Sequence, residues 1–208
     1  MSSLRFLGDM THIRHWEYTF LLQVLQSIEK KGTLLDVGCG ETNLSDYLAL
    51  EGWDVTGIDI VNMTLEHAKF IQGDARQIPR ADETYDVVIS ISAIEHMGFE
   101  GNPTQATLKD PDGDLKVMSE IRRILKTNGK AIISFPYICA NTQVNERNYT
   151  AGRLESLLKG FEIEKKAIIS GWQLRGWEIR DTPKNGEQNV LILCLKKKGE
   201  EIQSKEQY

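Results

Sequence analysis

The stretch LLDVGCGETNL, residues 34 to 44, joins an apolar run to a carboxylate and two glycines, a combination suited to holding a small charged ligand. Gly38 and Gly40 allow the backbone to turn sharply and place no Cβ in a ligand's way. A helix directly after them would present free N–H groups and the positive end of its dipole. The loop therefore favours an anionic group, either a phosphate or a carboxylate.

A second carboxylate, Asp59, indicates what else the ligand contains. Asp59 follows the glycines by about twenty residues, the spacing at which an acidic residue accepts hydrogen bonds from ribose hydroxyls. Dinucleotide-binding loops carry a third glycine where this chain has Asn43, and Asp36 would repel a phosphate but attract an amine. The pattern predicts a phosphate-free nucleoside that carries a charged amino acid, which describes S-adenosylmethionine.

The periodicity of apolar residues indicates which elements must position these groups. Runs with a helical period alternate with short apolar runs that are rich in β-branched residues. The predicted helices are 12–30, 43–50, 63–69, 114–126 and 151–159, and the predicted strands are 33–37, 54–60, 70–71, 85–91, 130–136, 161–169 and 190–196.

This alternation predicts a Rossmann-like, doubly wound α/β fold with a mostly parallel, seven-stranded sheet. No clear helix separates the last two strands, so we expect the last strand to be antiparallel. Ligands of such sheets bind beyond the carboxyl ends of the strands, near the end of the first one. We expect one domain over residues 1–198, with the helix at 12–30 as a lid or cover, the long loop at 98–113 as another candidate lid, and a frayed polar tail at 199–208.

Composition excludes several functional classes. Of the 208 residues, 40% are hydrophobic and 26% are charged, which argues against disordered and fibrous proteins. The net charge of −5 gives no broad basic field for nucleic acid. The sequence shows no apolar signal core or membrane span, so we expect no membrane association. Three isolated cysteines without C-x-x-C spacing fit the reducing cytoplasm.

Four segments, in this order and spacing, resemble the motifs of class I S-adenosylmethionine-dependent methyltransferases of the type 11 kind: LLDVGCGETNL, VTGIDI, IQGDARQIP and YDVVISISAIEHMG. The similarity runs from about Gly32 to Tyr137. It implies S-adenosylmethionine as cofactor and S-adenosylhomocysteine as product. More narrowly, WEY, ISAIEHMGF and DPDGDLKVMSEIRRILKTNGK resemble a little-characterised branch associated with sugar and surface-polysaccharide genes.

The resemblance also implies a cofactor site. Asp74 would accept a hydrogen bond from the adenine amino group, with the Ala75 backbone N–H beside it, and the Ser90–Ile91 backbone would line the methionine end. Thr42 replaces the more common glycine, and it either caps the following helix through its hydroxyl or tightens the pocket. The expected cofactor-binding residues are Asp36, Gly38, Cys39, Gly40, Asp59, Ile60, Asp74, Ala75, Ser90 and Ile91.

The candidate catalytic residues, Glu95 and His96, follow the fourth predicted strand, 85–91. The sulfonium of the cofactor is already activated, so methyl transfer needs mainly in-line placement of the acceptor, and an oxygen acceptor must also lose its proton. His96 is a suitable base, although it could instead be a packed histidine that orders the loop. Glu95 is expected to have a structural or polarising role. In some quinone-type relatives a similar pair is thought to lie near a divalent cation, but we predict no metal site here.

The sequence thus predicts an enzyme that methylates an oxygen of a small-molecule or sugar-containing acceptor. One alternative is transfer to a nitrogen of a protein or RNA; SISAIE lacks the prolines and aromatic residue typical of nucleobase methyltransferases. Another is a non-catalytic cofactor-binding or interaction domain, which the intact Asp36, Asp59 and Asp74 oppose. The sequence leaves open whether the protein is a monomer or a homodimer.

Overall fold

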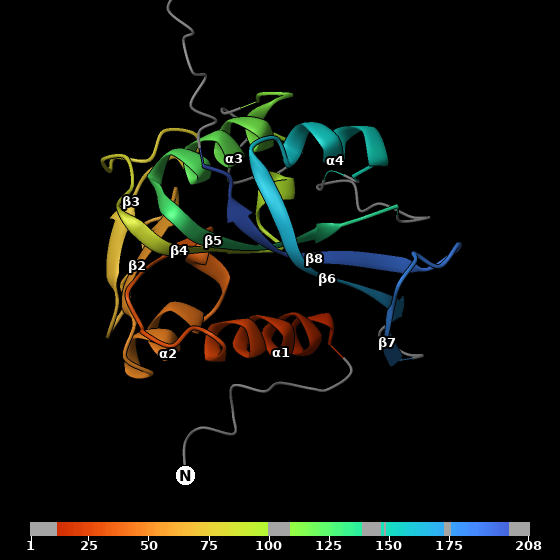
Figure 1. Ribbon diagram of the computed structural model, residues 1–208, viewed down its shortest axis with the longest axis horizontal. Coiled ribbons are helices and arrows are strands. Elements are labelled where there is room, and N and C mark those ends of the chain that lie inside the picture. The colour runs from red at the N-terminus through yellow and green to blue at the C-terminus, as the bar shows by residue number, and fades with distance from the viewer. Residues whose placement is uncertain (1–11, 100–108, 139–146, 148, 173–175, 200–208) are drawn as a thin grey trace, which may run out of the picture.

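Helices cover both faces of one twisted sheet in the computed structural model, which describes residues 12–99, 109–138, 147, 149–172 and 176–199 (Figure 1). Helices α1 (Ile13–Gln26) and α2 (Leu44–Leu50) cover one face, and α3 (Gly113–Ile124) and α4 (Ala151–Leu157) cover the other. This arrangement confirms the predicted doubly wound α/β fold.

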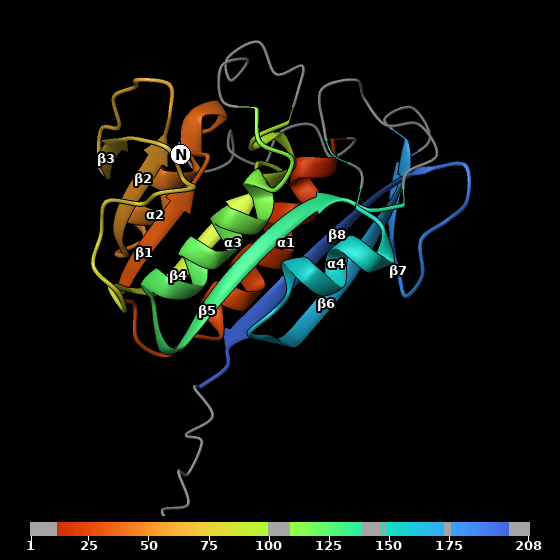
Figure 2. The same ribbon diagram turned by 90° about the horizontal axis from the view of Figure 1, so that it is seen from above.

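The sheet runs in the order β3-β2-β1-β4-β5-β8-β6-β7, from one side of Figure 2 to the other. The first five strands are parallel, and β8 lies antiparallel between β5 and β6, so the prediction of an antiparallel last strand is confirmed. The strands are β1 (Thr33–Val37), β2 (Asp54–Asp59), β3 (Lys69–Gln72), β4 (Tyr85–Ile91), β5 (Leu125–Pro136), β6 (Phe161–Trp172), β7 (Gly176–Arg180) and β8 (Gln188–Lys197).

The prediction of seven strands was wrong, because β7 adds an eighth strand in the described part of the chain. This strand pairs antiparallel with β6 at the edge of the sheet. A Cβ on Gly171 would lie 2.2 Å from the carbonyl oxygen of Gly176, so the two strands approach closely where they meet. The glycines and polar residues of this stretch obscure a strand of five residues, so the sequence predicts no strand between 169 and 190.

The predicted helix at 63–69 was also wrong. The side chain of Asp46 in α2 accepts hydrogen bonds from the backbone N–H groups of Glu66, His67 and Ala68, at 3.0, 2.7 and 2.9 Å. A carboxylate from a neighbouring helix therefore satisfies donors that a local helix would otherwise use. These three bonds also hold the pKa of Asp46 below its usual range, although burial alone would raise it.

Three helices end earlier than predicted, and α4 stops at Leu157 and not at residue 159. Helix α1 stops at Gln26 and not at residue 30, because Ser27 turns the chain and its hydroxyl donates to the carbonyl of Val24 at 2.7 Å. Helix α3 stops at Ile124, whose carbonyl accepts from the N–H of Thr84 at 2.7 Å. The chain then enters β5 directly, about five residues before the predicted strand.

Burial of the central strands on both faces fixes the place where their carboxyl ends meet. Leu34 and Ile89 pack in the cluster beneath α1 and α2, whereas Leu35 and Val88 pack in the cluster beneath α3. The site described below lies at this rigid edge. None of the helices in the described ranges is long and apolar enough to cross a membrane.

Candidate functional site

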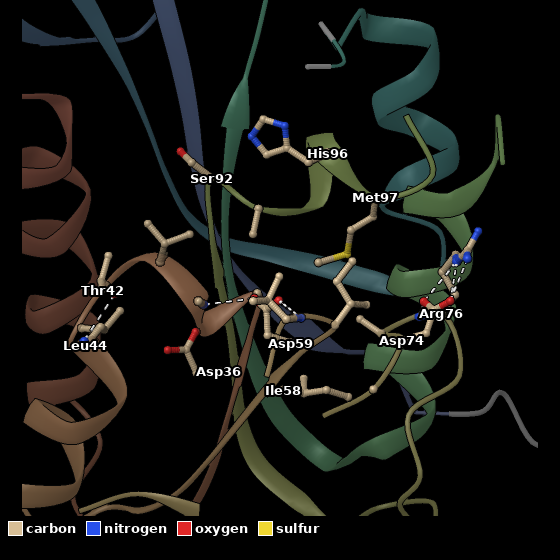
Figure 3. Close-up of a pocket in the computed structure, with 18 of the residues that line it drawn as sticks. Asp36, Thr42, Leu44, Ile58, Asp59, Asp74, Arg76, Ser92, His96 and Met97 are labelled. Atoms are coloured by element: carbon tan, nitrogen blue, oxygen red, sulfur yellow. Dashed lines mark hydrogen bonds and ion pairs between the residues drawn. The ribbon is translucent and has the colours of Figure 1, made fainter. Parts of the chain in front are cut away.

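A cavity of about 270 Å³ opens at the carboxyl ends of β1, β2 and β4 (Figure 3). Most of the residues predicted to bind a ligand lie in its wall. Asp36 lies toward one end of the cavity, Asp74 lies toward the other, and Asp59 lies between them, while His96 closes a further side. The predicted residues in the wall are Asp36, Gly38, Gly40, Asp59, Ile60, Asp74, Ala75, Ile91 and His96.

Three predicted residues, Cys39, Ser90 and Glu95, are placed behind this wall in the described part of the structure. Cys39 packs against β2, where a Cβ on Gly57 would lie 2.6 Å from its sulfur, and burial raises the pKa of its thiol. The hydroxyl of Ser90 donates to the carbonyl of Val37 at 3.1 Å and ties β4 to β1. Glu95 is 1% exposed.

Glycine is needed at each of the two loop positions, 38 and 40, for a different structural reason. Gly38 has a φ of +79°, and a Cβ there would lie 2.5 Å from the Cβ of Ala93, so glycine lets the loops after β1 and β4 meet. A Cβ on Gly40 would lie 2.8 Å from Oδ2 of Asp59. Glycine at position 40 therefore makes room for Asp59.

Backbone N–H groups hold the Asp59 carboxylate in place. Its Oδ2 accepts from the N–H of Gly40 at 3.0 Å, and its Oδ1 accepts from the N–H of Val61 at 2.9 Å. Each carboxylate oxygen can accept a further bond. Asp59 is thus a fixed acceptor in the middle of the cavity, suited to a pair of hydroxyl groups.

Asp36 is a buried carboxylate in the cavity wall, with 4% of its surface exposed. The hydroxyl of Ser45 donates to its Oδ2 at 2.7 Å. Burial raises the pKa of Asp36 to about 6; the Ser45 hydrogen bond opposes this rise and repulsion from Asp59 adds to it. A cationic ligand group at this end of the cavity would compensate the buried negative charge.

Asp74 is held by Arg76, a cavity residue that the sequence analysis missed. The Asp74 oxygens accept from the Arg76 backbone N–H at 2.9 Å and from the guanidinium at 2.7 to 3.1 Å. These bonds hold the pKa of Asp74 below its usual range, although burial alone would raise it. Arg76 also lies 3.4 Å from Asp110. An adenine amino group at Asp74 would share the carboxylate with this guanidinium.

Helix α1 contributes two further cavity residues that the sequence analysis missed, Arg14 and Tyr18. The Nη1 of Arg14 donates to the carbonyl of Ile91 at 3.2 Å and to Oε2 of Glu17 at 3.1 Å. Glu17 itself is fully buried. A signal existed in the sequence, because Glu17 falls among the apolar residues of its helix, where a charge indicates a buried partner.

His96 lies in the short 3-10 helix η2 (Ile94–His96), and its ring faces the cavity beside Ser92 and Met97 (Figure 3). Its position at the mouth of β4 follows from a turn that closes when the His96 N–H donates to the carbonyl of Ala93 at 3.1 Å. An imidazole here can exchange a proton with a group bound in the cavity.

Arg147 supports the segment that carries His96. Its backbone N–H donates to the carbonyl of Glu95 at 3.1 Å, and its guanidinium donates to the carbonyl of Met97 at 3.4 Å. The same guanidinium lies 3.3 Å from Asp114, which is fully buried and also binds Arg153. A buried charge cluster therefore fixes one wall of the cavity from behind.

Thr42 makes the helix-capping contact that the sequence suggested. Its hydroxyl accepts from the N–H of Leu44 at 3.3 Å, ahead of α2. Asn43, the residue that precedes the helix, makes no side-chain capping bond. Thr42 also lines the cavity, so it contributes both to the start of the helix and to the pocket wall.

Comparisons with known proteins agree with this geometry. Residues 35–133 match the model of the family described as "Methyltransferase domain". Ubiquinone biosynthesis O-methyltransferase of Rickettsia akari is 32% identical over 155 residues, which are 65% of this chain and 60% of that protein. The protein of the same name from Azorhizobium caulinodans is 29% identical over 166 residues, 70% of this chain and 65% of that protein. The chain thus spans about three fifths of the length of these relatives.

A solved structure shows the same fold. The 1,6-didemethyltoxoflavin-N1-methyltransferase of Burkholderia thailandensis, crystallised with its acceptor and S-adenosylhomocysteine, superposes with a TM-score of 0.64. The match covers 95% of this chain and 82% of that protein at 14% identity. From its sheet order, its glycine loop and these matches, the chain is similar to S-adenosylmethionine-dependent methyltransferases, and residues 35–133 resemble their methyltransferase domain.

Proposed function

We propose that this protein transfers the methyl group of S-adenosylmethionine to an oxygen of a small-molecule acceptor. The observation that carries the proposal is that three carboxylates, Asp36, Asp59 and Asp74, line one cavity in the order in which the cofactor presents its amine, ribose and adenine. A phosphate-bearing ligand fits poorly, because each carboxylate would repel it.

The wall of the cavity supplies a partner for each part of this cofactor. Asp36 would face the ammonium group, Asp59 would accept from the two ribose hydroxyls, and the Ala75 segment would hold the adenine edge. Arg14 binds the carbonyl of Ile91, two residues beyond the strand partner of Asp36, and would bind the carboxylate of the methionine part. Cys39 and Ser90 would act from behind the wall, by supporting the loop and β4.

Catalysis in this proposal relies on placement and on one proton transfer. When bound, S-adenosylmethionine supplies a methyl group on a sulfonium that needs no further activation. His96 would accept the proton of the acceptor hydroxyl, from its position on the side of the cavity that Asp36, Asp59 and Asp74 leave uncovered. Glu95 would act indirectly, as a buried residue that fixes the 3-10 turn carrying His96.

An oxygen acceptor is supported by the names of the relatives, which are O-methyltransferases. The resemblance to a branch associated with sugar genes supports a sugar-containing acceptor. The net charge of −5 argues against RNA, because a nucleic-acid acceptor requires a basic surface beside the pocket.

Calorimetric titration with S-adenosylhomocysteine tests the cofactor assignment. Wild-type protein should bind it. Asp59→Ala should lose most of the affinity, because it removes the carboxylate that would accept from the two ribose hydroxyls. Asp54→Ala is the matched control, since Asp54 lies at the other end of β2 and binds Lys69 at the surface. Absence of binding to folded wild-type protein, or equal losses in both variants, would refute the assignment.

The base assignment has a separate test. His96→Gln should lower kcat by about 100-fold or more for an oxygen acceptor, while the affinity for S-adenosylhomocysteine stays within about twofold. The loss should shrink as the pH rises, because the acceptor hydroxyl then ionises without help. Turnover of His96→Gln equal to wild type at neutral pH would show that His96 is not the base.

A further inference from the structure

A fully buried carboxylate joins helix α1 to the ends of two strands. Oε1 of Glu17 accepts from the hydroxyls of Ser92 and Ser134, both at 2.6 Å, and Oε2 accepts from Arg14 at 3.1 Å. Glu17 is 0% exposed. These partners come from α1, from the end of β4 and from β5, so one side chain connects three segments that are remote in sequence.

The two carboxylate oxygens of Glu17 have different effects. Oε1 fixes Ser92. Ser92 has a φ of +44°, a left-handed conformation that costs energy for a residue with a Cβ. The backbone N–H of Ser92 also donates to the hydroxyl of Ser134 at 2.9 Å. Ser92 lines the cavity directly after Ile91, so Glu17 holds the β4 turn in its observed shape.

The other carboxylate oxygen of Glu17, Oε2, fixes Arg14. The guanidinium lies between Oε2 of Glu17 and the carbonyl of Ile91, and it lines the cavity. A long side chain with no such anchor would lose several rotamer degrees of freedom whenever it bound a ligand. The buried charge of Glu17 also compensates the cost of keeping the Arg14 cation in the wall of the cavity.

We infer that Glu17 is a positioning residue for the amino-acid end of the cofactor, acting through Arg14 and Ser92 without touching the cofactor itself. The inference rests on the proposed function, because it assigns Arg14 to the cofactor carboxylate. It makes α1 part of the binding site and not only a cover of the sheet. Loss of Glu17 should weaken binding of the amino-acid end and leave binding of the adenosine end intact.

Two ligands separate these ends. S-adenosylhomocysteine contains the whole cofactor skeleton, whereas 5′-methylthioadenosine contains the adenosine and the sulfur but no amino acid. Glu17→Gln retains an oxygen acceptor for the two serines and removes the charge that binds Arg14. By calorimetry, the variant should bind S-adenosylhomocysteine about tenfold more weakly, with the affinity for 5′-methylthioadenosine within about twofold of wild type.

A double-mutant cycle shows whether Glu17 acts through Arg14. Arg14→Gln should lose at least as much affinity for S-adenosylhomocysteine as Glu17→Gln, and the double variant should lose little more than Arg14→Gln alone. Additive losses would overturn the inference, and so would unchanged affinity in Glu17→Gln. Equal losses for both ligands would also overturn it, because they would indicate a general structural defect.

Asp86→Asn is the matched control. Asp86 also binds hydroxyl, N–H and ammonium donors, from Thr33 and Lys126, but it lies near the amino end of β4, away from the cavity at the carboxyl ends of the strands. Asp86→Asn should lower stability and change neither affinity. If Glu17→Gln does not fold, Ser134→Ala provides a second test, because it removes one donor to the same carboxylate. Ser134→Ala should also weaken binding of S-adenosylhomocysteine more than binding of 5′-methylthioadenosine, with a smaller loss of affinity. An equal loss of affinity for both ligands would overturn the inference. If wild-type protein binds neither ligand, the proposed function itself fails.

Discussion

Asp36→Asn is expected to raise the melting temperature of the ligand-free protein and to reduce its affinity for S-adenosylhomocysteine on the order of 100-fold. Both effects have one cause. The buried Asp36 carboxylate has the Ser45 hydroxyl as a donor, and this neutral hydrogen bond compensates only part of its desolvation. A bound ammonium group would supply the missing compensation, so the charge favours binding at the expense of folding.

The sign of the pH dependence follows from the raised pKa. In the unfolded chain Asp36 ionises near its ordinary pKa of about 4, whereas in the folded protein burial raises this pKa to about 6. Its contribution to stability is therefore complete below about pH 4 and is lost as the pH rises through 6. A pKa difference of about two units corresponds to at most about 3 kcal/mol of unfolding free energy.

Thermal melts of wild type and Asp36→Asn at several pH values check this prediction. The two proteins should melt at similar temperatures near pH 4, and the variant should become the more stable one as the pH approaches 7. Asp54→Asn, which neutralises an exposed carboxylate, should show no such divergence. A variant that is less stable than wild type at pH 7.5 would contradict the explanation.

The second large effect is expected at Asp114. Asp114→Asn should lower the unfolding free energy by about 3 to 5 kcal/mol, because it leaves Arg147 and Arg153 beside a neutral, fully buried side chain. For a chain of this size, the melting temperature should fall by roughly 10 °C. Turnover should also fall, since Arg147 supports the backbone on both sides of His96.

Asp112 provides the control for Asp114. It lies two residues earlier and 3.8 Å from the same Arg153, but 65% of its side chain is exposed. Asp112→Asn should change stability by less than about 1 kcal/mol, since exposed ion pairs contribute little. Denaturant unfolding of both variants measures the difference, and similar losses would show that burial does not determine the energy of this cluster.

The parts of the fold that depend on local sequence could be predicted. The apolar runs of β1 and β4 specify buried parallel strands, and the glycine loop between β1 and α2 locates the cavity at their carboxyl ends. The helix predicted at 63–69 failed because Asp46, about twenty residues earlier, takes the N–H groups that a helix requires. The eighth strand was missed because β7 has five residues and gains its stability from pairing with β6.

Which residues line the cavity could be predicted to a similar degree and for the same reason. Asp36, Asp59 and Asp74 belong to continuous motifs, so spacing along the chain is enough to find them. Glu17 accepts hydrogen bonds from Ser92 and Ser134, which lie 75 and 117 residues away, and no local pattern connects them. Arg76 was missed because its partner Asp74 was interpreted only as a ligand-binding residue.

The position of β8 has a consequence for how the chain reaches this fold during synthesis. Strand β8 lies between β5 and β6 and is the last of the described strands to leave the ribosome. Until it appears, β5 and β6 each expose an unpaired edge of up to twelve residues, which are surfaces prone to pairing with other chains. The sheet can therefore close only after translation of β8, through contacts of long sequence separation that form slowly, so chaperones have a defined interval in which to act.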